Sequence, residues 1–195
     1  MQDIPMTSMS DAMVMAPQWL TMGLGAAFLC GAVYYLFRLC NPAYLTRLYG
    51  YADAENEFWH GTCLLAMVTM LTPALAPIPD AVWVWVLPVG CVWYLLRSVT
   101  WGRRKPHNKL WYDLAHAAMF FGMWWMYAQP LSNEPAAVHW AFVAYWGWFG
   151  SYYVVRLIGD LWKASWLAFW QDVFHLGMAV CMIVMTIWPT YLMVM

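Results

Sequence analysis

Long apolar runs alternate with short segments rich in proline and glycine along the chain. An α-helix needs about 20 apolar residues to cross the ~30 Å hydrocarbon layer of a bilayer. Runs of about that length lie at 18–38, 57–76, 81–99, 110–128, 137–158 and 167–189. Trp and Tyr crowd their ends, as is typical of the interfacial belts of membrane proteins. The pattern predicts an all-α integral membrane protein with six transmembrane helices.

Composition agrees with a surface that faces lipid. Of the 195 residues, 64% are apolar and only 10% are charged, whereas roughly a quarter of a soluble domain is charged. Residues 1–17 contain no Lys or Arg and no compact apolar core, so we expect no cleaved signal peptide there. We predict a single membrane domain over residues 18–195, preceded by a methionine-rich extracytoplasmic tail over residues 1–17. The tail contains Met1, Met6, Met9, Met13 and Met15.

The nine basic residues all lie in or beside alternate connections between the predicted helices. They are Arg38 and Arg47 at the first connection, Arg97, Arg103, Arg104, Lys105 and Lys109 at the third, and Arg156 and Lys163 at the fifth. Basic residues favour the cytoplasmic side of a membrane. The distribution therefore predicts a multi-pass protein of the plasma (inner) membrane with both termini extracytoplasmic.

A motif recurs three times. The odd-numbered runs end in Tyr34-Tyr35-x-x-Arg38, Trp93-Tyr94-x-x-Arg97 and Tyr152-Tyr153-x-x-Arg156. The even-numbered runs carry acid-x2-His-x2-sulfur-x3-Met-x2-Met. Its copies are Glu57, His60, Cys63, Met67, Met70; Asp113, His116, Met119, Met123, Met126; and Asp172, His175, Met178, Met182, Met185. The repetition predicts three helical hairpins, over about 18–76, 81–128 and 137–189, packed with pseudo-threefold internal symmetry.

The motif places its five residues on one face of a helix. Offsets of 0, 3, 6, 10 and 13 residues, at about 100° per residue, keep them within one stripe. At a rise of ~1.5 Å per residue the stripe is ~20 Å long. Because the three copies run in the same direction, equivalent residues can meet at equal depth. We expect a column of stacked layers: acids, histidines, Cys63 with two Met, and two layers of three Met.

These residue types point to a soft monovalent metal ion. Polar and coordinating groups inside a membrane usually face an interior and act there. Thioether suits Cu(I) and rejects hard ions, and imidazole also suits copper. We predict a Cu(I) site or path formed by the histidine and sulfur residues of the three motifs. The acids Glu57, Asp113 and Asp172 either form an ion exit or pair structurally with Arg38, Arg97 and Arg156.

A simpler interpretation remains open for each feature. Methionine is a common gap-filler in helix packing, and triplication of a segment copies any pattern whether or not it functions. Cys63 occupies a methionine position and is either a ligand or a small packing residue. His107 and His139 have no counterparts in the other repeats, and we assign them no role.

Two segments of the sequence resemble those of a known protein family. The segments LAHAAMFFGMWWMYA from Leu114 and FHLGMAVCMIVMTIWP from Phe174 resemble a family of small actinobacterial polytopic membrane proteins of unknown function, with His-x-x-Met-x-x-x-Met helices. The resemblance implies an all-helical membrane fold. The methionine ladders are also similar to those of eukaryotic high-affinity copper transporters, in which three subunits stack methionine triads. That similarity implies a functional analogy, with one chain supplying all three arms.

Three functions remain in competition. The first is a Cu(I)-binding membrane protein for copper uptake or for delivery to a membrane cuproenzyme. The second is an accessory, non-catalytic subunit of a larger membrane complex such as a copper-dependent hydrocarbon monooxygenase. The third is a redox carrier with b-type haem between His60, His116 and His175, since His is a haem ligand. We expect no catalysis by the chain itself. Its partners are the lipid bilayer and subunits of such a complex, and nothing indicates nucleic-acid binding.

Overall fold

The described part of the chain is helical throughout. A computed structural model describes residues 16–49, 53–100, 110–128, 135–163, 166–188 and 192. The helices are α1 (Gln18–Cys40), α2 (Pro42–Tyr49), α3 (Ala54–Leu71), α4 (Asp80–Val99), α5 (Leu110–Ala128), α6 (Ala136–Trp162) and α7 (Trp166–Ile187). These residues form no strand, and the predicted all-α class is confirmed for them.

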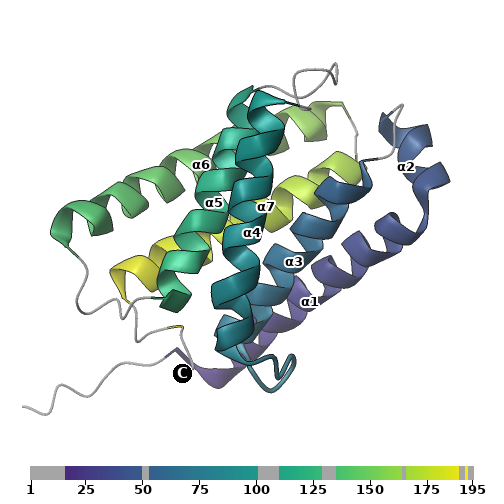
Figure 1. Ribbon diagram of the computed structural model, residues 1–195. Helices are drawn as coiled ribbons and strands as arrows, with labels where there is room; N and C mark the ends of the chain where they lie inside the picture. The colour runs from purple at the N-terminus through teal and green to yellow at the C-terminus, as the bar shows by residue number, and fades with distance from the viewer. Residues whose placement is uncertain are drawn as a thin grey trace, which may run out of the picture.

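The long helices pack in three pairs. The main helix–helix contacts join α1 to α3, α4 to α5 and α6 to α7, and the ribbon shows the long helices side by side in one bundle (Figure 1). The backbones of α3, α5 and α7 rarely come close to one another. Long side chains therefore fill the space between these three helices.

Among the described residues, three helices are long and apolar enough to span a membrane. They are Gln18–Cys40, Asp80–Val99 and Ala168–Ile187. The helices α3, α5 and α6 have 18, 19 and 27 residues, but their aromatic and polar residues lower the mean hydropathy. In α3 the first turn alone contains Glu55, Asn56 and Glu57. The chain thus has the features of a membrane protein, with polar groups concentrated on particular helices.

Two details differ from the sequence-based prediction. The second apolar run was expected to be helical over 57–76, but α3 begins at Ala54 and ends at Leu71. Pro73 explains the earlier end, because the residue before a proline is pushed out of the helical region. Thr72 accordingly has φ −151° and ψ 76°. The short helix α2 lies at one end of the bundle (Figure 1) and was not predicted.

Polar and apolar residues are distributed as lipid requires. Large apolar side chains are exposed on the outer helices, among them Trp19, Trp85 and Trp162. The ionisable residues Arg38, Glu57, Arg97, Asp113 and Asp172 are buried inside the bundle. Large exposed apolar surfaces of this kind are typical of faces that contact a membrane or another protein.

Glycine permits a close helix contact within the α4–α5 pair. A Cβ atom added to Gly90 would lie 2.5 Å from the Phe120 ring, closer than real packing allows. Between pairs, the Tyr127 hydroxyl donates to the Ala66 carbonyl at 2.8 Å, and the Tyr145 hydroxyl donates to the Ala115 carbonyl at 2.6 Å. These bonds join α5 to α3 and α6 to α5, so the three pairs form one unit.

Several predictions lie outside the described residues. They concern the methionines of residues 1–15 and the basic residues of 101–109 with His107.

Candidate metal centre

Three histidines converge at the centre of the bundle. His60, His116 and His175 come from α3, α5 and α7, and all are buried. Nε2 of His116 lies 3.1 Å from Nε2 of His60 and 3.4 Å from Nε2 of His175. The three potential ligand atoms all lie within 4.8 Å of one another. The structure therefore brings together the three histidines of the sequence motifs.

The other ring nitrogen of each histidine fixes the tautomer. Nδ1 contacts the backbone carbonyl four residues earlier in all three cases, at 2.6 Å in His60, 2.7 Å in His116 and 2.8 Å in His175. A carbonyl only accepts, so each Nδ1 carries the hydrogen and donates it. In a neutral ring Nε2 is then an acceptor. Three lone pairs consequently point at one another.

This arrangement fits a bound ion. At a metal–nitrogen distance of about 2.0–2.1 Å, ligands around one ion lie about 3.3–3.6 Å apart; the two short Nε2 contacts, at 3.1 and 3.4 Å, are close to this range, and all three ligand atoms lie within 4.8 Å of one another. Protein metal sites also commonly hold the outer ring N–H of a histidine ligand on a backbone carbonyl. Without a cation, buried acceptors that face one another lack donors, at a cost of about 1–3 kcal/mol for each one left unsatisfied.

A tyrosine stacks on each histidine. Tyr35 lies over His60 at a centroid distance of 5.1 Å, Tyr94 over His116 at 5.1 Å, and Tyr153 over His175 at 4.4 Å. The interplanar angles are 17°, 28° and 8°. Each tyrosine belongs to the helix paired with that of its histidine. The tyrosine of each Tyr-x-x-Arg motif thus packs flat against an imidazole and fixes the orientation of that ring.

The acids pair with the arginines of the same motif. Arg38 Nη2 lies 2.8 Å from Glu57 Oε1, Arg97 Nε lies 3.2 Å from Asp113 Oδ1, and Arg156 Nε lies 2.7 Å from Asp172 Oδ2. The structural pairing that the sequence suggested is therefore confirmed. An exit role for the acids stays a prediction.

The sulfur residues form a buried ladder on one side of the histidines. All nine are buried: Cys63, Met67, Met70, Met119, Met123, Met126, Met178, Met182 and Met185. The Cys63 thiol lies 3.6 Å from Sδ of Met123. By the register of the repeats, Met123 belongs to the next layer along the column. Neighbouring layers are therefore in contact.

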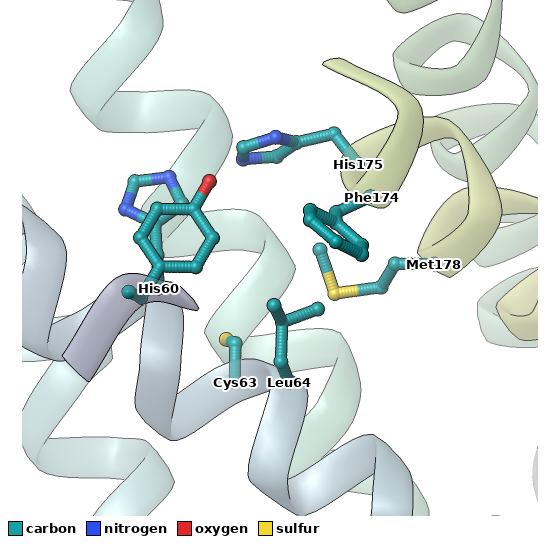
Figure 2. Close-up of a pocket in the computed structure, with 7 residues that line it drawn as sticks. His60, Cys63, Leu64, Phe174, His175 and Met178 are labelled. Atoms are coloured by element: carbon teal, nitrogen blue, oxygen red, sulfur yellow. The ribbon is translucent and has the colours of Figure 1, made fainter. Parts of the chain in front are cut away.

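One small space joins the histidine and sulfur layers. Its walls include His60, His175, Cys63 and Met178 (Figure 2). Tyr35, Leu64 and Phe174 complete it. Figure 2 shows the His60 and His175 rings above the thiol of Cys63 and the thioether of Met178. Nitrogen and sulfur side chains thus line the same narrow space.

Sequence reasoning missed the polar residues that support the triad. The Tyr94 hydroxyl donates to Asn56 Oδ1 at 2.9 Å, while the Asn56 backbone carbonyl accepts from His60. Asp53 binds Arg97 with two oxygens, at 2.8 and 3.2 Å. Neither residue recurs in the other repeats, so the repeat pattern gave no signal for them. Their position one turn or more before His60 was the available clue.

The chain matches no protein-family model, and comparison with curated proteins and with solved structures gives no match either.

Proposed function

We propose that the protein is a Cu(I)-binding integral membrane protein, acting in copper uptake or in delivery to a membrane cuproenzyme. The observation that carries the proposal is the convergence of three buried Nε2 atoms, each made an acceptor by the Nδ1–carbonyl hydrogen bond of its own ring. A proton shared by two of them leaves the third acceptor without a donor. A metal ion at the centre serves all three.

The adjacent ladder selects copper among the metals that imidazole accepts. Zinc and divalent copper also bind histidine. Eight thioethers and one thiol follow the triad along the column, and thioether is a soft neutral ligand that favours Cu(I). Thioether ligands are neutral and leave the ion's single charge uncancelled, so each sulfur site of the ladder holds copper weakly enough to exchange it, whereas the triad of imidazoles, which are stronger donors, holds it more tightly.

The same proposal includes a placement in the membrane. All six long helices span the bilayer as three hairpins about a pseudo-threefold axis, with the acids toward the cytoplasm and the methionines toward the exterior. The grouping of basic residues supports this orientation. A C-terminal alkaline phosphatase fusion is expected to be active in the periplasm or outside the cell, and an inactive fusion would reverse the orientation.

The geometry favours a bare ion over haem. A bis-histidine haem places its two ligands on opposite faces of a broad flat ring. Here the Nε2 atoms of neighbouring histidines are 3.1 and 3.4 Å apart, and a tyrosine covers each imidazole. A porphyrin has no place between them. A Soret band in purified protein would contradict this conclusion.

The test is metal binding by the purified full-length protein in detergent. We expect about one Cu(I) per chain to bind tightly at the triad, Ag(I) to compete for it, and Zn(II) in equal amount to displace little of either. Further copper is expected to bind weakly along the ladder. Protein that retains no copper and shows no thermal shift with Ag(I) would overturn the proposal, and a preference for zinc would overturn the choice of metal.

A further inference from the structure

We infer that ions reach the histidine triad only from the methionine end of the column, so that the protein is a one-ended copper site and not a through-channel. This inference rests on the proposed function and deepens it, because a site loaded and emptied at one end fits delivery to a membrane cuproenzyme and not uptake across the membrane. Two ends have to be compared: the acid end, one turn before the histidines, and the methionine end, three turns after them.

Ion pairs close the acid end. The three acids lie one turn from the histidines, and each contacts a buried or half-buried arginine at 2.7–3.2 Å. Arg97 holds a second carboxylate, that of Asp53, at 2.8 Å. An acid that already pairs with a guanidinium has little negative charge to offer a passing cation. Moving an arginine aside would leave a buried carboxylate uncompensated.

The arginines also pack against the tyrosines beside the triad. The guanidinium carbon of Arg38 lies 5.4 Å from the Tyr35 ring centre, that of Arg97 lies 5.9 Å from Tyr94, and that of Arg156 lies 5.6 Å from Tyr153.

These are the tyrosines that stack on the three histidines. Three guanidinium groups, each paired with an acid, therefore lie one ring away from the triad, and their displacement would disturb the rings that hold the imidazoles. Ion pairing and ring packing together close this end.

The methionine end has no ion pair to displace. The halves of α3, α5 and α7 that follow the histidines contain no Lys, Arg, Asp or Glu. At the end of the ladder, Met70 and Met126 are 7% and 6% exposed and Met185 is fully enclosed.

Contact between the Cys63 and Met123 sulfurs, at 3.6 Å, shows that successive ligand layers touch. An ion can then pass from one set of sulfur ligands to the next without water. The lack of charged residues in these three half-helices and the contact between ligand layers favour this entrance.

The test uses the full chain, loaded with one equivalent of Cu(I) and reconstituted in vesicles. A protease-sensitive tag at the C-terminus marks the methionine end, since α7 runs from the triad toward that terminus. Tag cleavage gives the fraction of molecules with this end outside. A membrane-impermeant Cu(I) chelator is then added externally, and the copper left on the protein is measured.

A one-ended column loses copper only from the fraction whose tag is cleaved. Loss from all molecules, or loss confined to the uncleaved fraction, would overturn the inference while leaving copper binding intact. Failure of the protein to hold copper before reconstitution would instead overturn the proposed function and this inference with it.

A paired variant sharpens the result. Arg38→Gln with Glu57→Gln removes one ion pair without leaving a lone buried charge, and it is expected to let the chelator strip copper from both orientations. Lys163→Gln, at the exposed end of α6, is the matched control and should behave as the parent protein. A paired variant that keeps one-sided loss would show that the ion pairs are not the barrier.

Discussion

At the scale of single residues, the hydrogen bond behind each imidazole determines what the triad can do. A histidine whose Nδ1 hydrogen were directed elsewhere could donate from Nε2 and satisfy a neighbour. The contacts to the carbonyls of Asn56, Tyr112 and Gln171 remove that option for all three rings. The site is thereby prepared for a cation by local helix geometry, because residue i−4 lies directly below each ring.

Replacement of His116 tests the shared ligand. His116 takes part in both short Nε2 contacts. We expect His116→Gln to weaken Cu(I) binding by about 100-fold or more, since even loss of a supporting partner weakens metal sites by 10–100-fold. A competition titration with a Cu(I) chelator measures the change. The control is His139→Gln in α6, and equal affinity in both variants would contradict the assignment.

The stacking of tyrosine on the triad leads to a separate prediction. Tyr153 is nearly parallel to His175, at 8° and 4.4 Å. Tyr153→Phe keeps the stacked ring and is expected to bind Cu(I) as the parent does. Tyr153→Leu is expected to weaken binding about 10-fold, in the lower range for loss of a supporting partner. The same titration decides, and identical affinities for the two variants would show that stacking does not position the ring.

At the scale of elements, each helix pair combines an aromatic helix with a ligand-bearing helix. The first supplies the tyrosine and the arginine, and the second supplies the acid, the histidine and the sulfurs. Close approach within a pair depends on small residues. Gly90 is the tightest case against an apolar neighbour, because Phe120 fills the space where a side chain would lie.

Substitution of Gly90 tests that contact. Gly90→Ala is expected to destabilise the protein by about 1–3 kcal/mol, the usual effect of overpacking. Gly147→Ala is the control, since a Cβ atom there meets nothing within 4 Å, and it should be neutral or stabilising. Unfolding in detergent measures both. Equal stability of the two variants would mean that α4 and α5 tolerate a wider separation.

At the scale of the whole molecule, the recurring sequence motif accounts for the residues that were predicted correctly. Residues outside the motif account for those that were missed. All twelve predicted ligands are buried in the described bundle, because helical periodicity places them on one stripe. Asn56 and Asp53 escaped prediction because they belong to one repeat only. The early end of α3 followed from Pro73, whose effect on an apolar run was underestimated.

Arg97 joins two helix pairs, and its substitution tests how the pairs are held together in the whole molecule. Arg97 binds Asp113 of its own pair and Asp53 next to α3. Arg97→Gln leaves two carboxylates uncompensated, and we expect a loss of about 3–5 kcal/mol of stability. Adding Asp53→Asn and Asp113→Asn should recover most of it. Thermal unfolding in detergent is the measurement, and no recovery would show that the arginine acts through packing and not through charge.

Copper K-edge X-ray absorption of protein loaded with one Cu(I) per chain tests the central claim most directly. Coordination by the triad predicts a nitrogen shell of two or three imidazoles at about 2.0–2.1 Å, which is lost in His116→Gln. A shell of sulfur alone, or a spectrum unchanged by that substitution, would contradict it.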